Sequence, residues 1–372
     1  MSQSCDGESG EADSNFRFVT LLLHGNEIFP PNACNAIEGT SFSAARPRNV
    51  TGIIAQTIAS RLGRSTIGAA ISVAILGGAS YALYELLRGI ELDKVLAALA
   101  GQSAQELFIS GAYVTAGYIA LTFYDVFALH AIGRHKVPYS VAALASFTSS
   151  TIGHNLGAAI LTGGLIRLRI YSVWGLTVAD IAKIAVLTGI TFWLGNALLL
   201  GGATAYIPEA ASTVDHLPPW LNRAIGFAGL FGIGLYLLWL APAPRVVGRS
   251  GWLILLPNFR FTLLQIGIGA LDLILVTLAM YALLPAIPAV GLPNVTVVFL
   301  MATLLGTVSH APAGLGVIEA TMLLGLPQYP REELLAALLT FRALYFLLPL
   351  LLAALSLGVR ELRMLARAAK SR

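Results

Sequence analysis

The sequence predicts an all-α, polytopic membrane protein with about six full spans and two re-entrant helical hairpins arranged as inverted repeats. Charged residues make up 11% of the 372 residues, against roughly 25% in soluble domains. The mean hydropathy is +0.77, and several stretches exceed the roughly 20 apolar residues that cross a bilayer as a helix. Two further apolar stretches, residues 151–171 and 307–326, contain glycines and polar groups, as broken membrane helices do.

The first 60 residues differ from the rest of the chain. They are polar and mixed, with Pro30, Pro31 and Pro47 and no sustained hydrophobic period. Their acidic start lacks the basic n-region of a signal peptide. We therefore expect a poorly ordered leader, residues 1–60, followed by a transmembrane domain, residues 61–372.

The full spans are expected where the apolar runs are longest. They lie at about residues 66–87, 107–129, 181–203, 220–240, 261–284 and 334–357. Arg61 and Arg64 precede the first span, and the positive-inside rule places that end of the chain in the cytoplasm. The basic loop at residues 134–136 brings the chain back to the cytoplasm after the second span.

The two broken stretches are predicted to enter the membrane and turn back. If residues 141–166 crossed completely, Arg245, Arg249 and Arg260 would lie outside, against the charge rule. A hairpin keeps them cytoplasmic, and a second hairpin at residues 294–326 leaves the basic C-terminal tail there too. Two complete crossings would also fit the tail alone.

The order of elements predicts a repeat. A span with Asp125, a hairpin with His154 and a span are followed by a span with Asp272, a hairpin with His310 and a span with Arg342. The first span of each half runs in the opposite direction, so the halves are inverted. Inverted repeats with broken helices near the midplane are typical of transporters.

Three acidic residues lie inside the apolar segments. A lone charge at the centre of a span costs at least about 2.5–3.5 kcal/mol, so Asp125 and Asp272 are expected to face the protein interior. Helix capping or a local ion pair is as good an explanation of Asp125 and Asp272 as a role in substrate or proton handling. Glu319 falls in the first turns of a helix, where the helix dipole favours a carboxylate, and capping alone can explain it.

Basic residues supply the candidate phosphate ligands. Arg167 and Arg169 lie at the end of the first hairpin, where arginines either snorkel to headgroups or bind phosphate bidentately. We favour a specific anionic-lipid contact, because Gly163 and Gly164 let a headgroup approach the backbone. His154 and His310 could carry protons, although a neutral, hydrogen-bonded role is the simpler interpretation of each.

Several function classes are disfavoured. The sequence contains no Walker loop, HExxH or GxSxG pattern, and Gly314 and Gly316 belong to a helix start and not to a dinucleotide fingerprint. Cys5 and Cys34 are not accompanied by other residues at the spacing of a metal site. We therefore expect no metal, and no motif indicates a cofactor. The net charge of +4 comes from basic residues beside the spans, which indicates membrane orientation and not nucleic-acid binding.

Three segments carry a family resemblance: LTGGLIRLRIYSVWGL at residues 161–176, APAGLGVIEATMLLGL at 311–326 and FRALYFLLPLLLA at 341–353. They resemble the transmembrane flippase domain of the lysyl-phosphatidylglycerol synthase/flippase (multiple peptide resistance factor) family. The most specific part runs from Leu161 to Tyr171. Ala313 stands where the family usually has glycine, and the catalytic aminoacyltransferase domain is absent, so the resemblance implies a flippase and not an enzyme.

We therefore expect a lipid flippase or lipid-handling protein of the bacterial inner membrane, with both termini cytoplasmic. Its partner would be an anionic or aminoacylated phospholipid. Arg167, Arg169 and Arg342 would hold phosphate, while Asp125, Asp272 and Glu319 would meet an amine or balance those charges. The alternatives are a membrane partner that presents lipid to a separate synthase or glycosyltransferase, and an ion-coupled exporter of a small solute. The sequence does not decide whether the protein forms a homo-oligomer.

Overall fold

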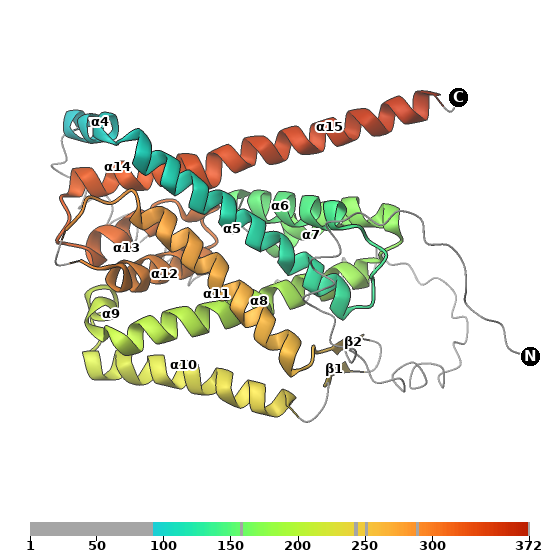
Figure 1. Ribbon diagram of the computed structural model, residues 1–372, viewed down its shortest axis with the longest axis horizontal. Helices are drawn as coiled ribbons and strands as arrows, with labels where there is room; N and C mark the ends of the chain where they lie inside the picture. The colour runs from blue at the N-terminus through green and yellow to red at the C-terminus, as the bar shows by residue number, and fades with distance from the viewer. Residues whose placement is uncertain (1–91, 157–158, 242–244, 250–251, 288–289, 371–372) are drawn as a thin grey trace, which may run out of the picture. The chain divides into compact units, whose positions relative to one another are not determined.

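The computed structural model describes residues 92–156, 159–241, 245–249, 252–287 and 290–370 (Figure 1). The predicted leader and the predicted first span, residues 66–87, lie outside these residues. The described part is almost entirely helical, which confirms the all-α polytopic class. It also contains two short antiparallel strands that the sequence did not predict, β1 (Val246–Arg249) and β2 (Trp252–Leu255).

Six described helical segments are long and apolar enough to cross a membrane. Four correspond to predicted spans as single helices: α5 (Ala104–Ala131), α8 (Val178–Tyr206), α10 (Pro219–Leu240) and α11 (Phe259–Tyr281). The fifth, Arg331–Arg360, corresponds to the predicted last span. The sixth is α12 (Leu292–Ser309), which the sequence assigned to the second hairpin.

The last predicted span is not one regular helix. It consists of α14 (Arg331–Arg342), a π-helical segment η3 (Ala343–Leu347) and α15 (Leu348–Lys370). A π turn leaves backbone groups without their usual partner and often marks a functional site. Here two of its carbonyls are bound from other helices. Tyr118 Oη donates to the Tyr345 carbonyl at 3.0 Å, and Asn155 Nδ2 donates to the Phe346 carbonyl at 3.3 Å.

The starts of α5 and α8 are fixed by their sequences. Ser103 and Glu106 form a capping box, in which the Ser103 hydroxyl accepts from the Glu106 amide and the Glu106 carboxylate accepts from the Ser103 amide. Thr177 and Asp180 do the same for α8. Each box satisfies amides that an N-terminus would otherwise leave unpaired.

Both predicted hairpins are pairs of helices packed against each other. The first consists of α6 (Tyr139–Leu156) and α7 (Ala159–Tyr171), and a short 3-10 turn, η1 (Ser172–Trp174), leads on to α8. The second consists of α12 and α13 (Val317–Gly325), joined through the short turn η2 (Pro312–Gly314). These pairs agree with the predicted hairpins, whereas their depth in a membrane stays a prediction.

The glycines of the first stretch do not interrupt its helices. Gly153 is helical in α6, and Gly163 and Gly164 are helical in α7, while residues 157–158 between the two helices lie outside the described residues. The second break does match the glycine-rich pattern. Its backbone takes positive φ values at His310, Ala313, Gly314 and Gly316.

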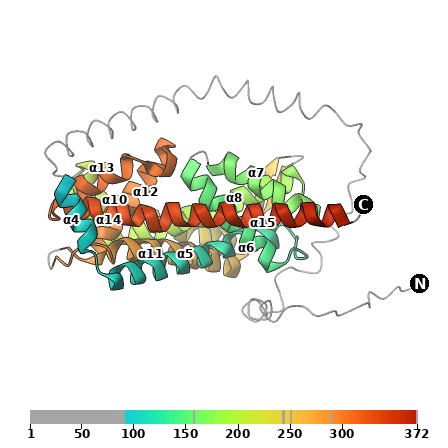
Figure 2. The ribbon, with the colours of Figure 1, turned by 90° about the horizontal axis from the view of Figure 1, so that it is seen from above.

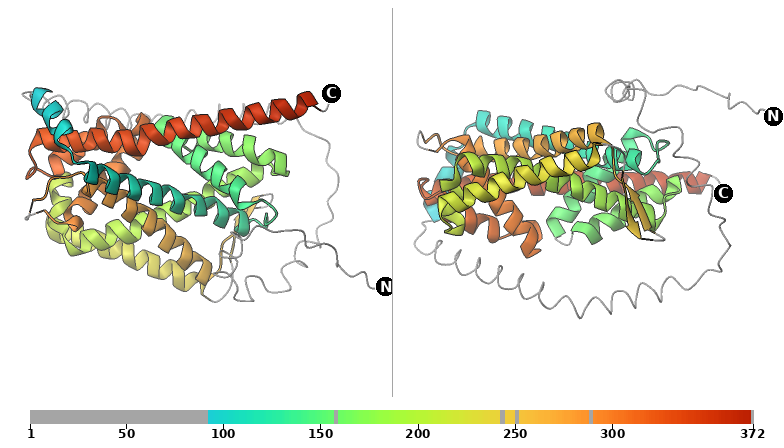
Figure 3. Two further views of the ribbon diagram at one scale, coloured as in Figure 1. Left: turned by 45° about the horizontal axis from the view of Figure 1, so that its top comes forward. Right: turned by 90° about the horizontal axis from the view of Figure 1, so that it is seen from below.

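The inverted arrangement is visible in the ribbon. Helices α5 and α11 pack side by side and run in opposite directions, and the two hairpins lie toward opposite ends of this bundle (Figure 1). The helices of the two hairpins lie end to end in Figures 2 and 3, and η2 of the second contacts α6 of the first. The loop after α5, strands β1 and β2 and the end of α15 lie at one end, while α4 (Leu92–Gly101) and α9 (Pro208–Asp215) lie at the other.

The central helices approach each other at glycines. A Cβ on Gly195 of α8 would lie 2.4 Å from the Gly269 carbonyl carbon of α11, and a Cβ on Gly269 would lie 2.5 Å from the Thr191 carbonyl oxygen. Small residues allow this close packing, which drives the association of membrane helices. Helices α8 and α11 therefore form a tightly joined frame.

Replacing Gly195 tests this frame. We expect Gly195→Ala to destabilise the protein by about 1–3 kcal/mol, because the new methyl group meets backbone atoms that cannot rotate away. The measurement is the free energy of unfolding in mild detergent. Gly189→Ala is the matched control in the same helix, because a Cβ there meets nothing within 4 Å; equal losses in both variants would refute the close approach.

Candidate functional site

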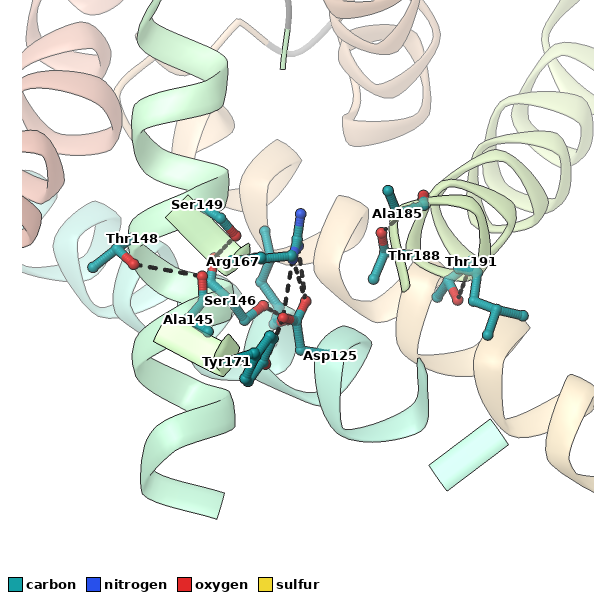
Figure 4. A network of polar contacts seen from close by, with 12 residues as sticks. Asp125, Ala145, Ser146, Thr148, Ser149, Arg167, Tyr171, Ala185, Thr188 and Thr191 are labelled. Atoms are coloured by element: carbon teal, nitrogen blue, oxygen red, sulfur yellow. Dashed lines mark hydrogen bonds and ion pairs between the residues drawn. The ribbon is translucent and has the colours of Figure 1, made fainter. Parts of the chain in front are cut away.

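A buried ion pair joins the first hairpin to α5. Asp125 has no exposed surface and Arg167 is 8% exposed. Arg167 donates from Nε to both carboxylate oxygens, at 3.1 and 3.0 Å, and from Nη2 to Oδ1 at 2.8 Å. Tyr171 Oη donates to Oδ2 at 2.8 Å. The carboxylate is thus compensated by a cation and by an additional donor (Figure 4).

Local sequence explains how α7 presents these groups. Arg167 and Tyr171 are four residues apart, so they share one helix face. Gly163 lets α7 approach α6, because a Cβ there would lie 3.1 Å from the Ser149 carbonyl oxygen. Gly163 therefore serves helix packing, which the sequence analysis did not foresee.

One guanidinium nitrogen of Arg167, Nη1, remains able to donate a hydrogen bond. Within the described part of the chain its Nη1 makes no hydrogen bond, and one nitrogen of the group points away from Asp125 in Figure 4. The nearby α6 segment is rich in hydroxyls: Ser146, Thr148 and Ser149 are buried. The guanidinium is thus fixed by Asp125 on one side and has donors left on the other.

A second ion pair is built on the second hairpin. Glu319 lies in the first turn of α13, where its Oε2 accepts from the Gly316 amide at 2.8 Å. Its Oε1 accepts from Arg342 Nε. The predicted helix-start role of Glu319 is therefore present together with an ion pair.

Arg342 also binds the backbone of η2, the turn between α12 and α13. Its Nη1 donates to the Ala313 carbonyl at 3.1 Å, and its guanidinium lies 5.6 Å from the centre of the Phe346 ring. Ala313 has a φ of 51°, a left-handed conformation that costs a non-glycine residue roughly 1–2 kcal/mol. Arg342 Nη2 is buried with no partner in the described residues, so this arginine too retains a donor.

The two histidines lie at the ends of the hairpin arms. His154 is exposed near the end of α6. His310 is exposed at the C-cap of α12, with a φ of 57° and its Nδ1 2.8 Å from the Val308 carbonyl oxygen. Neither histidine takes part in the two ion pairs.

Asp272 is the third buried acid, and its surroundings differ. It is 4% exposed, and its Oδ2 accepts from Tyr124 Oη at 3.1 Å. Its Oδ1 is buried with no hydrogen-bond partner among the described residues. Asp125 and Glu319 each have an arginine, whereas Asp272 has a tyrosine alone.

The structure brings the predicted residues together in pairs and not in one cluster. Arg167 joins Asp125 and Tyr171, and Arg342 joins Glu319. Arg169 lies on the exposed side of α7. A Cβ on Gly164 would meet nothing within 4 Å, so the space that the sequence analysis expected beside the backbone exists at Gly164 and not at Gly163.

Sequence reasoning missed the polar residues that connect these pairs to their neighbours. Tyr118, Tyr124 and Asn155 bind groups on distant segments, but nothing distinguishes them from ordinary membrane tyrosines and asparagines. The run SFTSST at residues 146–151 was the available signal, because five hydroxyl residues in six are unusual within an apolar span. Thr151 Oγ1 from this run is buried without a partner in the described part.

An apolar groove of about 380 Å³ lies beside Tyr118. Helices α5 and α6 form two of its walls, and the segment from Leu344 to Leu352 forms the third. Its lining is mainly aliphatic and aromatic, with Thr115 and Thr122 as further polar side chains. No group of three or more potential metal ligands occurs among the described residues.

Two curated proteins resemble the chain over most of their length. One is the uncharacterized protein slr0712 of Synechocystis sp., 33% identical over 304 residues, which are 81% of this chain and 92% of that protein. The other is the inner membrane protein YbhN of Escherichia coli, 32% identical over 246 residues, which are 64% of this chain and 75% of that protein. No protein-family model matches the sequence.

The Asp125–Arg167 pair yields a stability prediction. We expect Arg167→Met to destabilise the protein by about 3–5 kcal/mol, because Asp125 is left as an uncompensated buried charge. The double variant Asp125→Leu with Arg167→Met is expected to recover most of that loss. Unfolding of the purified variants in detergent measures both effects, and a double variant no more stable than the single one would contradict the pairing.

Proposed function

This chain belongs to the family of slr0712 and the inner membrane protein YbhN, and from that premise we propose that it moves phospholipid headgroups between the leaflets of a bacterial inner membrane. The observation that carries the proposal is the pair of arginines, one on each half of the bundle, of which Arg167 is buried and Arg342 is partly buried. Each is fixed by an acid and retains an unpaired guanidinium nitrogen in the described structure.

The chemistry of the site suits a phosphate. A guanidinium recognises phosphate oxygens through parallel hydrogen bonds, and an acid on its other edge fixes its direction before the ligand arrives. A headgroup that crosses hydrocarbon unaided loses its hydration at high cost. Arg167 and Arg342 would replace part of that hydration.

The pairing revises the roles expected for the acids. Asp125 and Glu319 are each engaged by an arginine, so they act as the counter-charges and not as the groups that meet a headgroup amine. This arrangement favours an anionic lipid over an aminoacylated one. The groove beside Tyr118 is apolar, so it suits an acyl chain that stays in hydrocarbon while the headgroup moves.

Two further considerations support the assignment. Residues 161–176 and 311–326 resemble the flippase domain of the lysyl-phosphatidylglycerol synthase family, and they contain Arg167 and Glu319. The name of YbhN places that relative in the inner membrane. Basic loops and the end of α15 lie at one end of the bundle, which by the positive-inside rule is the cytoplasmic end.

Reconstitution tests the proposal. The purified chain is placed in vesicles of phosphatidylglycerol and phosphatidylethanolamine that contain a trace of headgroup-labelled phosphatidylglycerol, and a membrane-impermeant reductant bleaches the outer leaflet. We expect bleaching to continue past the outer-leaflet half as the protein delivers inner lipid. Arg342→Gln is expected to slow this phase by about tenfold or more, in line with the loss of one charge-assisted hydrogen bond.

Arg260→Gln is the control variant. Arg260 is an exposed arginine at the start of α11 and lies in neither ion pair, so its loss removes the same charge without touching the site. Protein-free vesicles give the background rate. An unchanged plateau with wild-type protein would refute lipid movement, and co-purified lipid without movement would favour a partner that presents lipid to a separate enzyme.

A further inference from the structure

Asp272 differs from the other buried acids in one respect that matters for energy coupling. Among the described residues Asp125 has Arg167 and Glu319 has Arg342, but Asp272 contacts only the Tyr124 hydroxyl. A buried carboxylate without a cation is unfavourable in an apolar interior. The group must therefore take up a positive charge from elsewhere.

The surroundings of Oδ1 decide which positive charge fits. A Cβ placed on Gly117 would lie 3.8 Å from Oδ1, 3.6 Å from Val276 and 3.7 Å from Leu275. The free oxygen thus lies close to the backbone of α5 at Gly117. A sodium ion requires several oxygen ligands, whereas a proton requires only Oδ1 itself.

The helices packed against α11 bring few charges toward this position. Helix α5 contributes Tyr118, Tyr124 and Asp125, which Arg167 engages. Helix α12 contains no titratable side chain. On α8 the charged residues are Asp180 and Lys183, both within the first two turns of a 29-residue helix.

The remaining neighbours do not change this balance. On α10 the titratable residues are Arg223 and Tyr236, while α14 contributes Arg331 and two glutamates at its start and Arg342 at its end. Arg342 is engaged by Glu319, and η3 brings Tyr345, whose ring packs on Tyr118 with centres 5.5 Å apart. None of the ion pairs found in the described residues includes Asp272.

We infer that Asp272 is the proton-carrying group that couples lipid movement to a transmembrane pH difference. This inference rests on the proposed function. A proton from water binds Oδ1, forming the O–H bond of a neutral acid, and leaves to water on the other side when the bundle changes conformation. Because α5 and α11 are the two central antiparallel helices, a change of charge between them alters their packing and hence the access to the site.

Two measurements test this inference, and the first does not depend on transport. Infrared spectra of the purified protein should show the carbonyl stretch of a protonated carboxylic acid, and Asp272→Asn should remove that band. Thr277→Val is the matched control on the same helix, because its hydroxyl is buried but bonds only to the Leu273 carbonyl. A band that survives in Asp272→Asn would overturn the assignment.

The second measurement uses the vesicle assay with and without a pH difference across the membrane. Wild-type exchange should accelerate under one direction of the gradient, and Asp272→Asn should exchange lipid with no response to it. Stimulation that persists in Asp272→Asn, wild-type exchange that ignores the gradient, or loss of exchange in the variant under both conditions would each overturn the coupling.

These measurements distinguish a failure of the proton-carrying role of Asp272 from a failure of the proposed lipid movement. If wild-type protein moves no lipid at all, the proposed function falls, and the infrared band alone decides whether Asp272 holds a proton. If Asp272→Asn does not fold, Tyr124→Phe replaces it, because loss of the donor to Oδ2 should shift the pH at which the band appears. An unshifted band in Tyr124→Phe would overturn the proton site.

Discussion

The structure depends on one constraint: in a membrane interior every polar group must find its partner within the protein. The bidentate contact between Arg167 and Asp125 shows how this chain meets the constraint. The acid supplies the charge that allows an arginine to be buried, and the arginine supplies the donors that the acid requires. The second hairpin repeats the solution with Glu319 and Arg342. Each pair satisfies only part of its guanidinium in the described structure, so each arginine keeps a donor beside its structural contact.

Much of the fold was predictable because its determinants are local. Apolar run length located α5, α8, α10 and α11, and the capping residues Ser103 and Thr177 mark two of their starts. The hairpins followed from the positions of arginines relative to the spans, and the opposite directions of α5 and α11 followed from counting crossings. Each of these features can be derived from a short window of sequence and the charge rule.

The site was less predictable because its pairings are long-range. The sequence singled out Asp125 and Arg167 separately, but it assigned the arginine to a headgroup and left a local ion pair as one alternative for the acid. It expected Gly163 and Gly164 to let a headgroup approach the backbone, but Gly163 packs closely against α6, because glycine serves close helix packing as readily as it opens space. The surroundings of Asp272 could not be inferred, since its distinguishing feature is that none of the described residues supplies it with a cation, and the identity of a residue does not indicate whether it has a partner.

The π-helical segment has a consequence for how the two halves of the chain depend on each other. A π turn holds one residue more than an α turn, and one residue rotates everything beyond it by about 100°. Tyr118 and Asn155, both from the first half, bind the carbonyls at Tyr345 and Phe346 and so hold that extra residue in place. The orientation of α15 is thus set by side chains contributed more than 190 positions earlier in the chain, and a one-residue deletion in η3 would turn a different face of the last helix toward α6.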